Sequence, residues 1–183
     1  MKFILHTAIA VVVLSVLAEP ARALTWNDNP ICRYHQADHS KRCTVGTQNA
    51  NLSAPKRQLL VYQCLINPNN PRYGREFIAV EPGAGKRSKL APGLTDAQGS
   101  HHYSVMVQLD NNQPEAMTMM TLPGTPLVVF FDQHNYMGMI DRILSSGQIR
   151  VSIPYASGAE TVRFILSGAK NAAQRALEMC RQP

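Results

Sequence analysis

The chain contains 183 residues, 45% of them hydrophobic, and carries a formal net charge of +6. That length is usual for one domain with a single core. Beyond the N-terminus, no segment approaches the run of about 18 apolar residues that spans a bilayer, which excludes further membrane-spanning helices.

The N-terminus predicts a cleavable signal peptide over residues 1–23. Lys2 precedes an uncharged apolar run, Ala8 to Leu17, that is too short to span a bilayer. Ala21-Arg22-Ala23 then supplies the small-x-small pattern that signal peptidase recognises, so we expect the mature chain to begin at Leu24. A retained signal anchor is the alternative. Export places the protein outside the cytoplasm.

The basic residues are distributed unevenly. Without the leader the chain keeps 16 basic and 11 acidic side chains, and ten of the basic ones fall between Arg33 and Lys89. This asymmetry predicts a basic face that contacts lipid headgroups, glycan phosphates or an acidic protein, although a solvated charged surface explains it equally well. Nucleic acid is not expected, because no aromatic residues are interleaved with the basic ones. The residues assigned to the basic face are Arg72, Arg75, Lys86, Arg87 and Lys89.

The segment 24–57 shows no clear periodicity, and we predict a loop that precedes a β-sandwich domain over residues 58–183. From residue 58, runs of β-forming residues alternate with turn signals. Residues 82–100 are rich in glycine and basic residues and predict a long exposed loop. Pro154 indicates an edge strand or a bulge in the strand that contains it. The predicted strands are 58–66, 76–80, 102–110, 115–122, 125–132, 149–155 and 162–166.

Two segments show helical spacing of apolar residues. Residues 136–145 predict a short amphipathic helix, and residues 169–181 predict a C-terminal helix capped by Ser167. The fold class that follows is mainly β, an antiparallel sandwich or barrel-like domain with a short helix and a C-terminal helix. The inward stripe of the last helix is Ala169, Ala173, Ala176, Leu177 and Cys180.

Four cysteines allow three disulfide pairings, and their number alone does not choose among them. Their positions favour Cys32 with Cys43, which closes a small loop, and Cys64 with Cys180, which ties the last helix to the first core strand. The alternative is zinc. The spacing of Cys32, His35, His39 and Cys43 suits a four-ligand site if a helix presents both imidazoles on one face. An oxidising compartment favours disulfides.

No catalytic signature is present, and we assign no catalytic residue, metal or cofactor. The glycine-rich stretch at 83–86 fails as a phosphate loop because Val80 stands where glycine is needed. Asp132, His134 and Asp141 can support general-base chemistry or bind a cation, but a polar loop between a buried strand and a helix explains them as well. His101 and His102 are expected to begin a strand.

Four segments carry a family resemblance: LLVYQC at 59–64, VMVQLD at 105–110, MIDRILSSGQIRVSIPY at 139–155 and TVRFILSGAKNAAQRALEMC at 161–180. Together they resemble exported bacterial proteins of the type VI secretion-associated VasI-like kind and, more loosely, the invasion-associated locus B-like family. The resemblance implies a periplasmic or secreted β-sandwich that acts by binding, with Cys64 and Cys180 bridged. The chain departs from the pattern in having only Trp26 and in its basic loop at 82–100.

We therefore expect a non-enzymatic exported bacterial protein that binds a protein or an anionic envelope component, in secretion or host interaction. The basic face permits peripheral membrane contact. The alternative is an exported hydrolase or metal-binding protein that uses Asp132 and His134.

Overall fold

The computed structural model describes residues 26, 29–35, 39–48, 58–67, 75–82, 90, 91, 93–96, 99–121, 127–132 and 135–182. The predicted signal peptide at 1–23 lies outside these residues. Of the helices that they form, neither is long and apolar enough to span a membrane.

The chain forms one antiparallel sheet and two helices, which confirms the predicted fold class. The strands follow one another across the sheet in the order β1-β2-β3-β4-β8-β7-β6-β9-β10, and β5, which lies off this path, also pairs with β6. The elements are β1 (Ile31–His35), β2 (Ser40–Gln48), β3 (Leu59–Ile66), β4 (Arg75–Glu81), β5 (Leu94–Thr95), β6 (His101–Leu109), β7 (Glu115–Thr121), β8 (Val128–Phe131), α1 (Tyr136–Leu144), β9 (Gln148–Tyr155), β10 (Gly158–Ile165) and α2 (Ala169–Arg181).

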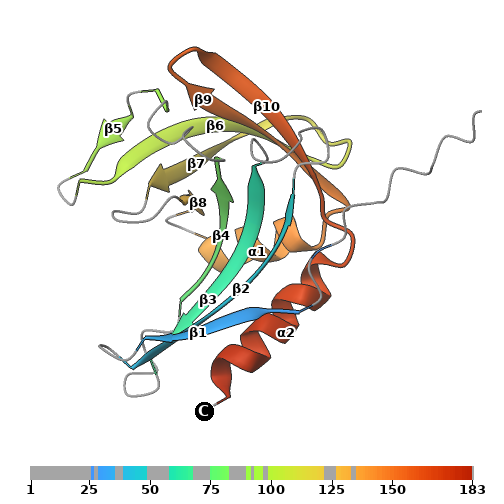
Figure 1. The fold of residues 1–183 in the computed structure, drawn as a ribbon. Coiled ribbons are helices and arrows are strands. Elements are labelled where there is room, and N and C mark those ends of the chain that lie inside the picture. Colours follow the sequence, from blue (N-terminus) through green and yellow to red (C-terminus); the bar gives the residue numbers. More distant parts are fainter. Residues whose placement is uncertain are drawn as a thin grey trace, which may run out of the picture.

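The sheet curls so that its two ends approach each other (Figure 1). Gln58, next to β3, donates a side-chain hydrogen bond to Glu160 of β10, with 3.0 Å between Nε2 and Oε1. Near the same end, the buried indole of Trp26 donates from Nε1 to the carbonyl oxygen of Ile165 at 3.1 Å. The domain is therefore a barrel-like form of the predicted fold, made from one sheet.

The N-terminal segment corrects the sequence prediction. Part of the predicted loop at 24–57 forms β1 and β2, and β2 pairs with β3 from Lys41–Ile66 to Gln48–Leu59. Gly46 allows close approach within the strand, because a Cβ there would lie 2.6 Å from the carbonyl oxygen of Leu60. The predicted boundary between residues 57 and 58 therefore does not separate a loop from the sheet.

The predicted loop at 82–100 is also partly built into the sheet. Thr95 of β5 pairs with His101, and Leu90 forms an isolated bridge with Tyr155. Gly93 is needed here, because a Cβ would lie 2.7 Å from the carbonyl oxygen of His102. The same glycine content that predicted an exposed loop therefore permits close backbone packing.

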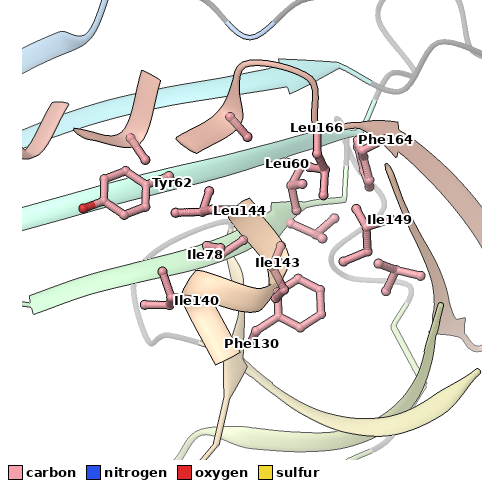
Figure 2. Close-up of a cluster of buried hydrophobic side chains, with 14 of the residues drawn as sticks. Leu60, Tyr62, Ile78, Phe130, Ile140, Ile143, Leu144, Ile149, Phe164 and Leu166 are labelled. Carbon is pink, nitrogen blue, oxygen red and sulfur yellow. The ribbon is translucent and has the colours of Figure 1, made fainter. Parts of the chain in front are cut away.

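Both helices pack on the concave face of the sheet and complete one core. Ile140 and Ile143 of α1 point toward Ile78 and Phe130 of the sheet (Figure 2). The predicted amphipathic helix is confirmed, and its cap is Asn135, whose side chain accepts a hydrogen bond from the Gly138 backbone at 3.2 Å. The core therefore depends on α1 to fill the space inside the curl.

Helix α2 lies across β1, β2 and β3, and its packed face consists mainly of alanine. The predicted inward stripe is largely confirmed, with Ala172 added and Leu177 half-buried. The predicted Ser167 cap is wrong. The cap position is Gly168, whose φ of 81° lies in the left-handed region that glycine tolerates.

The predicted edge position of the strand containing Pro154 needs correction, because β9 lies between β6 and β10. The pairing with β6 covers only Ile149 to Val151. Pro154 lies beyond it and pairs with Ala159 of β10, so its missing N–H costs no ladder bond to β6.

We predict that Ile143→Ala lowers the free energy of unfolding by about 2–5 kcal/mol, because Ile143 is fully buried and its removal leaves a cavity. Guanidinium unfolding followed by the fluorescence of Trp26 measures the loss. Met106→Ala is the control, since Met106 is 47% exposed and its truncation should change stability by less than about 0.5 kcal/mol. Equal losses in the two variants would contradict the assignment of α1 to the core.

Candidate functional site

Strands β4 and β8 separate from each other at one end, and a groove forms there. Their pairing covers only Ala79–Val129 and Val80–Val128. Beyond these pairs the gap is lined by the start of β4, the end of β8 and the first turn of α1. The groove encloses about 450 Å³.

Most of the groove is apolar. Met137 is 53% exposed, so the groove is open to solvent rather than enclosed. Methionine and aromatic side chains together provide an adaptable apolar surface. The apolar lining residues are Leu65, Phe77, Met120, Phe131, Tyr136 and Met137.

A row of arginines crosses the sheet beside this apolar surface. Register pairing places Arg33 opposite Arg42, Arg42 opposite Leu65, and Leu65 opposite Arg75. Residues paired directly across neighbouring strands share one face of a sheet. The row therefore lies on one face of the sheet, and the residues next to each arginine in the sequence lie on the other face, toward α2. Arg42 and Arg75 reach the groove.

Neither groove arginine forms an ion pair with the residues that the structure describes. Arg42 is half-buried, and its Nε atom is shielded from solvent without a hydrogen-bond acceptor among those residues. A shielded guanidinium N–H without an acceptor costs free energy, which an incoming carboxylate or phosphate offsets. The groove thus combines an apolar floor with cations available to an anion.

The one acidic residue among the described lining residues is Glu76, and it already has a partner. The Tyr62 hydroxyl donates a hydrogen bond to Glu76 Oε2 at 2.7 Å. Burial raises the pKa of Tyr62 above its usual range, and the hydrogen bond to Glu76 raises it further. Burial and the charge of Glu76 also raise the pKa of Tyr136, against a smaller opposing effect of Arg75. Both phenols stay neutral, and of the two Tyr136 lines the groove.

Of the predicted basic face, the structure places only Arg75. Arg72, Lys86, Arg87 and Lys89 lie outside the described residues. Arg42 was not predicted as a site residue, because it falls in the predicted loop. Its position directly before Cys43 could have indicated its place. If the segment is a strand, the side chains of Arg42 and Cys43 point to opposite faces of the sheet.

A second cavity of about 650 Å³ lies between β7 and α1 and contains Asp132. The Oδ1 atom of Asp132 accepts a hydrogen bond from the Asn135 backbone N–H at 3.0 Å, which supports the turn that begins α1. His134 lies outside the described residues, and Asp141 is exposed on the helix. His101 begins β6, as predicted, and His102 Nε2 lies 2.8 Å from Asp96 Oδ2.

The cysteines form the two predicted disulfides, Cys32–Cys43 and Cys64–Cys180. The helix that a zinc site at Cys32, His35, His39 and Cys43 required is not formed. This segment is a β-hairpin instead, with a disulfide between its strands. His39 has a φ of 53° in the turn, and its Nδ1 lies 3.0 Å from the Tyr34 hydroxyl.

Comparisons with known proteins give no relative for this chain: no family model, curated protein or solved structure matches it. The VasI-like resemblance stays a prediction from the sequence segments that carry it.

We predict that Tyr62→Phe weakens the dependence of stability on alkaline pH. The pKa of Tyr62 is raised in the folded chain above the value of 10.0 that is expected in the unfolded chain. The contribution of this phenol to the free energy of unfolding is therefore complete below pH 10 and is lost as the pH rises. The wild-type free energy of unfolding should therefore fall above pH 10, by at most roughly 1.4 kcal/mol per pH unit from this group. Denaturant unfolding between about pH 9 and pH 11 measures the slope.

The matched control is Tyr34→Phe, because Tyr34 is exposed on β1. This variant should keep the wild-type slope, whereas Tyr62→Phe should show a smaller one. An unchanged slope in Tyr62→Phe would mean that the fold does not raise the pKa of this phenol.

Proposed function

We propose that this chain is an exported, non-enzymatic protein that binds an acidic segment of a partner protein in the groove between β4 and β8. The observation that carries this proposal is the pairing of an apolar floor with Arg42 and Arg75, neither of which forms an ion pair with the described residues. Acidic side chains of the partner would meet the arginines, and its apolar side chains would occupy the floor.

An extended peptide suits this groove better than a lipid does. An acyl chain gains most when it is enclosed, whereas the half-exposed Met137 leaves the groove open along its length. A peptide with intermittent apolar side chains can bury these and leave its backbone at the surface. The basic residues Arg72, Lys86, Arg87 and Lys89 add to the positive charge of the chain, which would speed association with an acidic partner.

Export is supported by the two disulfides, which persist in oxidising compartments. The burial of Trp26 is consistent with cleavage before Leu24, because such cleavage keeps the tryptophan in the folded domain. We propose a periplasmic or secreted location on these grounds, with a role in secretion or host interaction.

We predict that bacterial expression yields a mature chain that begins at Leu24 and contains no free thiol. Intact mass of the protein released from the periplasm or medium checks both points, because each disulfide removes two hydrogen atoms. A mass that retains residues 1–23 would contradict cleavage, and labelling by an alkylating reagent would contradict the disulfides.

We predict that the double reversal Arg42→Glu/Arg75→Glu weakens peptide binding by about a hundredfold or more, because it removes two hydrogen bonds to charged groups, each worth roughly 1.5–3 kcal/mol. The probe is a panel of fluorescent peptides that combine Glu or Asp with Leu and Phe, measured by anisotropy. A matched panel has Gln and Asn in place of the acids. The wild-type protein should prefer the acidic panel, and about 1 M salt should reduce the preference.

Arg163→Glu is the control reversal, since Arg163 is exposed on β10 and outside the groove lining. It should leave peptide binding near the wild-type value. Equal binding of the neutral panel, or full binding by the double reversal, would rule out the groove as an acidic-peptide site.

Anionic phosphatidylglycerol vesicles test the wider basic face separately. Lys86→Glu/Arg87→Glu/Lys89→Glu should weaken any salt-dependent vesicle attachment without abolishing peptide binding. Vesicle binding that requires Arg42 and Arg75, together with no binding of either peptide panel, would overturn the peptide proposal in favour of a lipid surface.

A further inference from the structure

Three of the cysteines lie in one row across the sheet. Cys32 of β1 pairs in register with Cys43 of β2, and Cys43 pairs in register with Cys64 of β3. All three therefore project from the same face, toward α2, where Cys180 is bonded to Cys64. The two disulfides are neighbours.

The sulfur atoms of this row are close enough for exchange. The Sγ atoms of Cys43, Cys64 and Cys180 all lie within 4.8 Å of one another, and each of these cysteines is at most 2% exposed. Cys32 is half-buried and lies on β1, the last strand at its end of the described sheet. A reductant from solvent thus reaches the Cys32–Cys43 disulfide first.

We propose that the four cysteines form a thiol–disulfide exchange site, in which reduction of Cys32–Cys43 is passed inward to break the Cys64–Cys180 bond. The co-reactant is a dithiol reductant, which donates two electrons, becomes a disulfide itself and leaves thiols at Cys32 and Cys43. The Cys43 thiolate then attacks Cys64 Sγ. The Cys43–Cys64 bond forms, the Cys64–Cys180 bond breaks, and the electron pair leaves on the Cys180 thiolate. The second step involves no net oxidation.

The register explains why Cys64 is the sulfur attacked. The Cα atoms of Cys32 and Cys43 are 4.0 Å apart, the close spacing of an antiparallel pair without mutual backbone hydrogen bonds. Such pairs alternate, so Cys43 and Cys64 form a hydrogen-bonded pair, with Cα atoms about 5.5 Å apart. That spacing falls within the usual disulfide range of about 4.4–6.8 Å. The new bond thus joins facing residues of adjacent strands, as Cys32–Cys43 does.

Exchange also moves the free thiolate from the interior of the sheet to the end of the C-terminal helix. Cys43 lies in β2 between two paired strands, whereas Cys180 lies in the last turn of α2, beside the exposed Arg181. Once its bond is broken, the end of α2 is held by contacts such as the hydrogen bond from Lys41 Nζ to the Gln182 carbonyl oxygen at 3.1 Å. Release of Cys180 therefore loosens the C-terminal helix, while the strands stay cross-linked.

The test uses the full mature chain with the substitution Cys32→Ser, purified under oxidising conditions. This variant leaves Cys43 without its disulfide partner. Thiols are blocked with N-ethylmaleimide at acid pH, and the tryptic peptides are mapped by mass spectrometry without reduction. Cys43, Cys64 and Cys180 fall in the separate peptides 43–56, 58–72 and 176–181. We expect a cross-link between the first two peptides and the label on Cys180. The matched control, Cys43→Ser, should keep Cys64–Cys180 and carry the label on Cys32.

If Cys32→Ser retains Cys64–Cys180 and carries its label on Cys43, the exchange does not occur. Should that variant fail to fold, wild-type protein treated with one equivalent of a dithiol gives an independent result. Labels on Cys32 and Cys180 with a Cys43–Cys64 cross-link would support the relay. Labels on Cys32 and Cys43 with Cys64–Cys180 intact would overturn it.

Discussion

The Cys64–Cys180 disulfide is the constraint on which the arrangement of this domain depends. Helix α2 packs against the sheet mainly through alanines, each of which buries little more than one methyl group, worth roughly 0.8 kcal/mol. The disulfide joins residues 116 positions apart and holds the helix against β3, with an expected contribution of about 2–5 kcal/mol. Small side chains and a covalent tie together allow the helix to lie close to the strands.

Both helices pack on the concave face, so they leave the opposite face of the sheet uncovered. Strands β1, β2 and β4 carry arginines on the face that the helices leave uncovered, and the register aligns them into a row with Leu65 of β3. Strands β4 and β8 share only two residue pairs, so the sheet opens beside this row and α1 lines the gap. The groove thus results from the same curl that creates the core.

Adjacent residues of β2 belong to the two different chemical sites. Arg42 reaches the groove and Cys43 lies in the cysteine row, because successive side chains of a strand point to opposite faces. The proposed binding groove and the proposed exchange site therefore share one strand. The first uses charge and apolar contact, and the second uses proximity of buried sulfur atoms.

The sequence by itself determined the elements whose periodicity is strong and local. The alternation in β6 and the helical spacing of α1 and α2 are visible in neighbouring residues, and the positions of the cysteines were enough to predict both disulfides. Only the tertiary structure decided that β1 and β2 join the sheet, because residues 24–57 show no clear periodicity and their strands form by pairing, β1 with β2 and β2 with β3. It also decided which side chains meet at the groove. Arg42, Arg75 and Tyr136 are brought together by register and by the divergence of β4 and β8, which depend on contacts between residues far apart in the chain.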